Sequence, residues 1–228
     1  GPRVFALPPG TDFPAAIVAG LQARMAGQPP EAMAQVTLYL NTTRMRRAVR
    51  DVLTARGAAF LPRLRLVTDP AERQLPAVSP LRRRLELSQL VARLLDAQPD
   101  LAPRTALYDL SDSLARLMDE LQDEGVSPDA LAALDVSDHS AHWKRTQDFL
   151  RIITPFFTSP EPADQMARLR RTVLALADGW RAAPPLHPVI VAGSTGSRGT
   201  TALLMQAVAG LPQGALILPG FDLSLIHI

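Results

Sequence analysis

The chain has 228 residues, 47% of them hydrophobic, so it can bury a substantial core as one large domain or two small ones. It has no cysteine, which excludes disulfides, thiolate metal sites and iron–sulfur ligation by its own side chains. No apolar run approaches the roughly 18 to 20 residues of a membrane span, and the N-terminus lacks a signal-peptide core, so we expect a cytoplasmic protein with no membrane contact.

The formal net charge of +2 conceals an uneven distribution. Residues 1–65 carry nine arginines and three acids, a balance of +6, whereas residues 100–165 carry five basic side chains and thirteen acids, a balance of −8. Lys144 is the only lysine, so nearly all positive charge is guanidinium. Guanidinium suits bidentate phosphate contacts, although an arginine-rich coding bias gives the same composition.

Short apolar runs alternate with amphipathic ones in the first third of the chain. The expected elements are strands over 3–7, 34–43 and 58–69 and helices over 13–27 and 44–57. This alternation predicts a parallel α/β sheet, with residues 1–78 as its first part.

Helices alone are expected in the next part, an all-helical insertion over residues 79–184. They are predicted over 79–98, 107–125, 127–134, 140–157 and 162–183. Ser79 is the expected N-cap of the first helix, with Pro80 at its first position. Its apolar side is expected to carry Leu81, Leu85, Leu90, Leu94 and Leu95. Residues 185–222 then return to the sheet, with "HPVIVAG" and "GALILPGF" as strands around the helix "TTALLMQAVAGL".

A glycine-rich turn, "GSTGSRGTT", lies between the fourth expected strand and the last helix. It fits neither the Walker A pattern G-x-x-x-x-G-K-[ST] nor the dinucleotide fingerprint G-x-G-x-x-G. It can form an anion site at the start of that helix, or simply a turn that caps it. The anion-binding candidates are Gly193, Ser194, Thr195, Gly196, Ser197, Arg198, Gly199 and Thr200.

The loop after the first strand, "LPPGTDFP", lacks the features of a phosphate loop. Pro8 and Pro9 have no amide proton, no lysine is present, and Asp12 would repel a phosphate. If "VIVAG" occupies the position of a helicase's magnesium-binding acids, Ala192 and Gly193 replace those acids. We therefore expect no ATPase site and assign no catalytic residue.

Four arginines at the start of the second helix are the DNA-binding candidates: Arg44, Arg46, Arg47 and Arg50. They follow a strand and are placed to meet backbone phosphates. No aromatic stacking platform accompanies them, so an ordinary surface helix is the alternative.

Other polar groups favour structural explanations. His139 and His142 have i,i+3 spacing, but no cysteine or nearby third histidine completes a zinc site, so we assign no metal site and expect a helix start there. A set of acids late in one amphipathic helix predicts a solvated face rather than an acid–base pair. These acids are Asp119, Glu120, Asp123 and Glu124. Trp180 is expected to pack in a core.

The order of several segments resembles the N-terminal part of the AddB family, the partners of AddA in alphaproteobacterial AddAB helicase–nucleases. The segments are "VFALPPGTDFP", "VTLYLNTTRMRRAVR", "LPRLRLVTD", "PLRRRLELSQLVARLL", the helical stretch over 107–143, and "HPVIVAGSTGSRGTTALLMQAVAGLPQGALILPGFD". Together they span residues 3–222, and the last is the most specific.

The resemblance implies a degenerate superfamily 1 helicase domain, helical insertion included, that holds DNA ends beside AddA in double-strand break repair. It also implies a C-terminal nuclease with magnesium and a cysteine-bound iron–sulfur cluster. None of that nuclease's catalytic residues can be carried onto this sequence. No cofactor is therefore expected for these residues.

The final "LSLIHI" can be encoded by the mosaic-end adapter of transposase-based library preparation. We therefore expect residues 223–228 to be a non-native tail on a fragment that ends near Asp222.

Three functional hypotheses follow. The first is a non-catalytic AddB-type scaffold that holds DNA and packs against AddA. The second is an α/β nucleotide- or sugar-phosphate-binding enzyme that uses the glycine-rich turn. The third is a purely structural interaction module.

Overall fold

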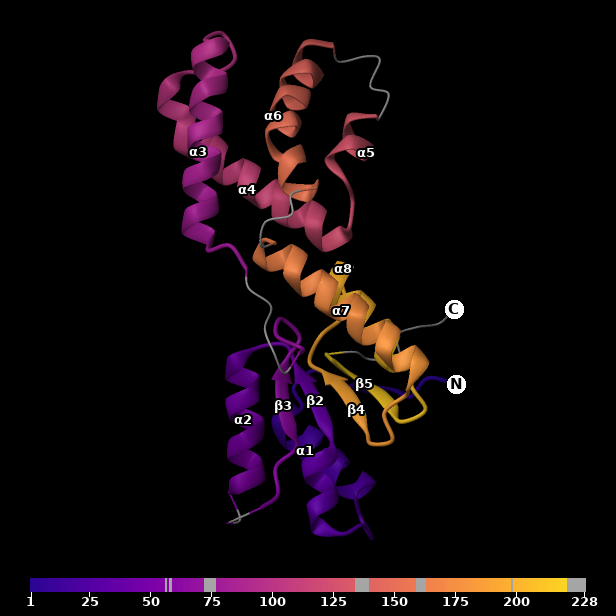
Figure 1. Ribbon diagram of the computed structural model, residues 1–228. Helices are drawn as coiled ribbons and strands as arrows, with labels where there is room; N and C mark the ends of the chain where they lie inside the picture. Colours follow the sequence, from indigo (N-terminus) through magenta and orange to yellow (C-terminus); the bar gives the residue numbers. More distant parts are fainter. Residues whose placement is uncertain are drawn as a thin grey trace. The chain divides into compact units, whose positions relative to one another are not determined.

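The computed structural model describes residues 1–55, 57, 59–71, 77–133, 140–158, 163–197 and 199–220. The chain divides into two compact units (Figure 1). The sheet unit comprises residues 1–73 and 172–228, and the helical unit comprises residues 74–171. The boundary between Arg171 and Thr172 falls inside one helix. The expected tail over 223–228 lies outside the described residues.

The sheet unit is built on parallel strands, which confirms the predicted α/β class. The strands are β1 (Val4–Leu7), β2 (Thr37–Leu40), β3 (Arg63–Leu66), β4 (Val189–Ala192) and β5 (Gly214–Pro219). The helices are α1 (Phe13–Arg24), α2 (Thr43–Thr54), α8 (Gly199–Ala209) and the second part of α7 (Gln165–Ala182). A short 3-10 turn, η1 (Pro30–Gln35), was not expected from the sequence.

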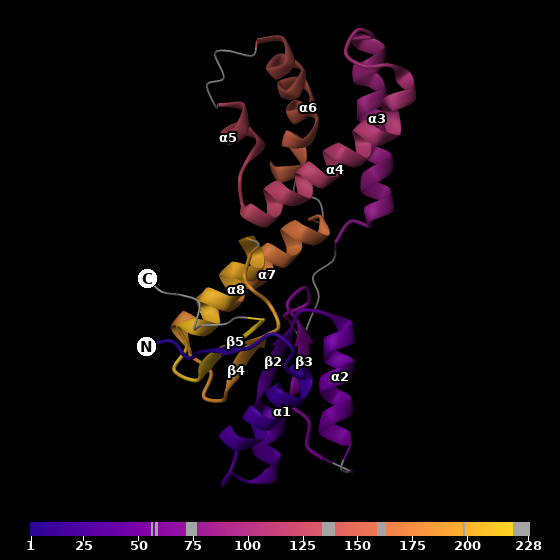
Figure 2. The same ribbon diagram turned by 180° about the vertical axis from the view of Figure 1, so that it is seen from behind.

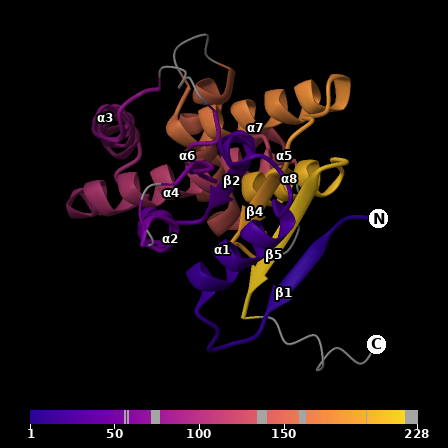
Figure 3. The same cartoon turned by 90° about the horizontal axis from the view of Figure 1, so that it is seen from below.

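The strand order is β1-β5-β4-β2-β3, with β1 outermost beside β5 (Figure 3). Thr37 of β2 pairs with Arg63 on one side and Val189 on the other. From β2 the chain moves outward to β3, whereas from β4 it moves the opposite way to β5. Right-handed crossovers therefore place α2 and α8 on opposite faces. The carboxyl ends of β2 and β4 form the point where the topology diverges, the usual place for a ligand in such sheets.

Alternating side chains of β2 divide the core between the two faces of the sheet. Leu38 and Leu40 are fully buried in a cluster with Ile17 of α1 and Val49 of α2. Tyr39 points to the other face, where its ring lies 6.5 Å from that of Trp180, centroid to centroid. The packing role predicted for Trp180 is thus confirmed.

The helical unit follows the expected succession of helices (Figure 2). They are α3 (Pro80–Ala97), the 3-10 turn η2 (Arg104–Ala106), α4 (Leu107–Glu124), α5 (Pro128–Ala132), α6 (Ser140–Thr158) and the first turns of α7. Ser79 caps α3 by accepting a hydrogen bond from the amide of Arg82, and Gly125 ends α4 with a left-handed φ of 70°. Within the described ranges, no helix has the length and apolar character needed to cross a membrane.

The predicted apolar side of α3 is wrong in its first half. Leu81 and Leu85 are 66% and 55% exposed. The buried residues that follow one another at i,i+4 spacing are instead Arg83, Leu87, Val91 and Leu95. A charged side chain therefore occupies a position on the inward face that hydropathy alone would give to a leucine.

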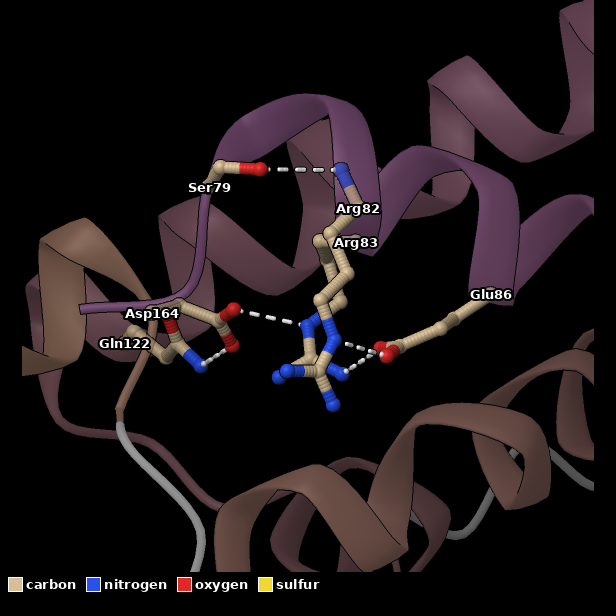
Figure 4. Close-up of polar contacts among 6 residues, drawn as sticks. All are labelled: Ser79, Arg82, Arg83, Glu86, Gln122 and Asp164. Atoms are coloured by element: carbon tan, nitrogen blue, oxygen red, sulfur yellow. Dashed lines mark hydrogen bonds and ion pairs between the residues drawn. The ribbon is translucent and has the colours of Figure 1, made fainter.

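Arg83 is buried, and its guanidinium lies between the carboxylates of Glu86 and Asp164 (Figure 4). Its Nε donates to Oδ1 of Asp164 at 2.7 Å, and its Nη1 donates to Oε2 of Glu86 at 2.5 Å. The guanidinium lies 4.0 Å from the ring centroid of Phe156. Gln122 donates through Nε2 to the second oxygen of Asp164 at 3.0 Å. These contacts offset the cost of removing two charges from water.

The same network lies where the chain enters and leaves the helical unit. The amide of Val78 donates to the carbonyl of Ala163 at 3.1 Å, one residue before Asp164. The bond between Arg83 and Asp164 therefore ties the beginning of α3 to the segment that precedes α7.

Candidate nucleic-acid interface

Helix α2 has one apolar face and one basic face. The hydroxyl of Thr42 caps the helix by accepting a hydrogen bond from the amide of Met45 at 3.1 Å. Val49 and Leu53 bury the apolar face against the sheet. The opposite face therefore presents the arginines of the segment to solvent.

The structure places the four DNA-binding candidates along this basic face. Arg44, Arg47 and Arg50 are exposed, and Arg46 is half-buried at the border with the apolar side. Asp51 is also exposed on α2, so the local charge is strongly but not purely positive. This exposure suits contact with phosphates, which lie on the outside of a duplex.

Two arginines of β3 point to the face of the sheet opposite α2, and the sequence analysis did not nominate them. Arg65 pairs in register with Tyr39, whereas Leu64 packs in the core on the α2 side. Arg46 and these two arginines come together only at the edge of β3. Arg46 lines a cavity of about 340 Å³ together with Arg63 and Arg65. Asp69 also lines the cavity, and Nη1 of Arg65 donates to the carbonyl of Pro70 at 3.4 Å. The alternation "RLRL" was the available signal, because residues two apart share one side of a strand.

The glycine-rich turn uses several of its backbone amides within the protein. The amide of Gly193 donates to the carbonyl of Ile217 at 3.1 Å, and that of Gly196 to Oγ of Ser194 at 3.3 Å. Both glycines have positive φ, 83° and 68°. Amides engaged in this way do not point outward as a cradle for phosphate, which favours the turn that only caps α8.

The remaining anion-binding candidates lie in the turn itself or at the start of α8. Helix α8 begins at Gly199, and Thr200 is buried. Ser194 is half-buried, Thr195 and Ser197 are exposed, and Arg198 lies outside the described residues. The sequence therefore predicted the position of this turn, whereas the role of Arg198 stays a prediction.

Asn41 lies beside the turn, at the carboxyl end of β2. Its Oδ1 is buried and has no hydrogen-bond partner among the described residues. A Cβ added to Gly193 would lie 3.1 Å from that oxygen. This close contact and the left-handed φ of 83° both favour glycine at position 193.

The loop after β1 directs a carboxylate toward the helix that follows it. Oδ1 of Asp12 accepts a hydrogen bond from the amide of Ala15 at 3.1 Å and caps α1. In a phosphate loop the ligand takes this position at the helix N-terminus. Asp12 thus occupies that position with a negative charge, and Pro8 and Pro9 supply no amide protons.

Metal binding finds little support in the side chains that the structure describes. Among those residues, no group of three or more His, Asp or Glu side chains gathers as metal ligands. His139 and the side chain of His142 lie outside the description, and the chain has no cysteine to hold an iron–sulfur cluster. Three of the four acids of α4 are exposed as expected, namely Asp119, Glu120 and Glu124, whereas Asp123 is half-buried.

Comparison with known proteins does not identify a relative of this chain. No family model matches the chain, and no curated protein matches it. The AddB-type resemblance therefore stays a prediction from the residues that carry it.

Proposed function

We propose that the chain is the non-catalytic N-terminal part of an AddB-type subunit. In this role it holds DNA ends beside an AddA-type motor in the cytoplasm during double-strand break repair. The arrangement of a parallel sheet interrupted after β3 by a helical unit supports a degenerate helicase-like domain. By the resemblance, magnesium and an iron–sulfur cluster would belong to a nuclease domain outside this sequence. The chain has no cysteine to hold such a cluster.

The observation that carries the DNA-holding role is the basic face of α2. Arg44, Arg47 and Arg50 are exposed on α2, and Arg46 joins Arg63 and Arg65 at the adjoining cavity. Guanidinium groups bind phosphate oxygens through two parallel hydrogen bonds and displace condensed counterions. Such contacts position DNA without reading its sequence.

The loops support a holding rather than a hydrolytic role. Asp12 occupies the N-terminus of α1, and the amides of Gly193 and Gly196 are bonded within the protein. A nucleoside triphosphate would find no lysine in these two loops, and the amides of Gly193 and Gly196 are already engaged. We therefore assign the arginines of α2 to DNA binding and not to nucleotide binding.

Fluorescence anisotropy with a labelled duplex of about 20 base pairs tests this proposal. The double variant Arg44→Ala/Arg47→Ala should bind about tenfold more weakly or worse, because each change removes a charged hydrogen bond to phosphate. Arg93→Ala is the matched control, since Arg93 is an exposed arginine on α3 in the helical unit. It should bind as the unchanged chain does.

Two results would overturn the proposal. One is equal loss of affinity in the Arg93→Ala control, which would indicate general charge attraction. The other is saturable nucleotide binding that Arg198→Ala abolishes in a chain without DNA affinity, which would favour the phosphate-binding enzyme.

A further inference from the structure

An apolar groove of about 620 Å³ lies in the sheet unit on the face that carries α1. Its walls include Ile17 and Leu21 of α1, Phe5 and Leu7 of β1, and Ala215 and Ile217 of β5. The groove is separate from the cavity that Arg46, Arg63 and Arg65 line, because the two share no lining residue, and it includes no residue of α2. A function for it therefore goes beyond the DNA-holding role.

The apolar walls of this groove are only partly covered. Phe5 is 54% exposed and Leu186, at the rim, is 86% exposed. Helices α1 and α2 pack on Leu38 and Leu40 nearer the centre of the sheet, while β1 forms its outer edge (Figure 3). Parallel sheets are normally covered by helices on both faces, so this strip lacks its cover among the described residues.

The rim of the groove is positively charged. Nη2 of Arg24 donates to the backbone carbonyl and to Oε1 of Gln213 at 3.0 and 3.1 Å, and Nη1 of Arg3 donates to the carbonyl of Pro212 at 2.8 Å. No carboxylate is present among the described residues that line the groove. The neutral oxygens hold both guanidinium groups in place, and neither group pairs with a carboxylate among the described residues.

The charge of one rim arginine acts on the other. Burial, and then the charge of Arg3, lower the pKa of Arg24 from its usual value. An arginine nevertheless stays protonated at neutral pH. A negative group placed near both side chains would relieve this repulsion.

We propose that the groove docks an amphipathic helix of a partner protein, with apolar side chains against Phe5 and Leu21 and a carboxylate beside Arg3 and Arg24. The open form of the groove and the exposed Leu186 favour an elongated occupant over a small ligand, which would need burial on most sides. A helix is the element that covers such a sheet face, and an apolar stripe at i, i+3, i+4 and i+7 matches helix-in-groove recognition.

Gly20→Leu tests the groove without removing any contact. Gly20 lies on α1 and lines the groove, and a Cβ there would meet nothing within 4 Å. The added leucine should occupy the groove, and because leucine favours helix over glycine the melting temperature should not fall. Gly179→Leu is the matched control, because Gly179 is an equally open helical glycine on α7 that does not line the groove.

The probes are two fluorescein-labelled peptides of about 18 residues with leucines at helical spacing and either glutamates or lysines beside them. The glutamate peptide should bind the unchanged chain with an affinity at least about tenfold higher than that of the lysine peptide. Gly20→Leu should weaken it about tenfold, and Gly179→Leu should leave it unchanged. Arg24→Gln should remove most of the preference for glutamate.

Equal binding of the two peptides, or unchanged binding by Gly20→Leu, would overturn the proposal. So would a small apolar anion, anilinonaphthalene sulfonate, that fills the groove and that neither peptide displaces, because this would indicate a small-ligand site. DNA affinity is measured in parallel and should be the same in Gly20→Leu. Failure of the groove proposal is thus distinguishable from failure of the DNA-holding role.

Discussion

Arginine has opposite roles in the two units. On α2 of the sheet unit, Arg44 and Arg47 are exposed to solvent, whereas on α3 of the helical unit Arg83 is buried and paired with Asp164. The residue type is the same in both units. The two roles differ because the fold places a carboxylate beside Arg83. A charge balance along the sequence therefore locates basic and acidic regions without showing which charges a partner can reach.

The acidic balance of the helical unit illustrates the same point. Asp164 contributes to the excess of acids over 100–165, yet its two oxygens are bonded to Arg83 and Gln122 inside the unit. Its charge stabilises the fold and is not available to repel DNA.

The largest predicted effect is the loss of the buried arginine. Arg83→Ala should lower the free energy of unfolding by about 3–5 kcal/mol, because it leaves the buried carboxylate of Asp164 without its cation. Urea unfolding followed by circular dichroism measures the change.

Arg84→Ala is the control for this prediction. Arg84 is the next residue on α3 and pairs with Asp112 at 2.7 Å on the surface. Its loss should cost less than about 1 kcal/mol. Similar losses for both variants would show that burial does not distinguish the two ion pairs.

A second prediction concerns the sheet unit and the close packing of its backbone around Gly214. A Cβ on Gly214 would lie 1.8 Å from the carbonyl oxygen of Val208, at the end of α8. Gly214→Ala should therefore destabilise by about 1–3 kcal/mol through forced movement of backbone. Gly210→Ala is the control, because the nearest atom to its added Cβ is 3.6 Å away. A stable Gly214→Ala variant would contradict the close approach.

The smallest predicted effect is a pH dependence in the helical unit. Although Asp119 is exposed overall, partial desolvation of its carboxyl group, and then the charge of Asp164, raise its pKa above 3.8. The folded state thus favours the protonated form, and this contribution to stability is lost as the pH rises from 3.8 through the raised value. Asp119→Asn should be at least as stable as the unchanged chain at neutral pH. Its free energy of unfolding should also fall less as the pH rises through this interval. Urea unfolding at several pH values measures it, and a steeper decline in the variant would contradict the sign.

Local features of the fold could be predicted from the sequence. The Ser79 cap, the Gly125 stop and the alternation of strands and helices depend on residues within a few positions of one another. The inward face of α3 could not, because the partner of Arg83 lies 81 positions away. Hydropathy therefore assigned Leu81 and Leu85 to the wrong side.

The candidate interface divides in the same way. The four arginines of α2 follow from a strand-to-helix pattern, so the sequence could nominate them. Arg63 and Arg65 meet only Arg46 of that set, at the edge of β3, and this depends on strand order. The bonded amides of Gly193 and Gly196 likewise depend on the position of β5 and the shape of the turn.

The salt dependence of DNA binding tests the central claim most directly. Each arginine that contacts a phosphate should contribute about 0.9 to the slope of log affinity against log salt concentration. The DNA-holding account predicts a steep slope for the unchanged chain and a slope smaller by about 2 for Arg44→Ala/Arg47→Ala. A binding affinity that salt does not change, or an unaltered slope in the double variant, would contradict it.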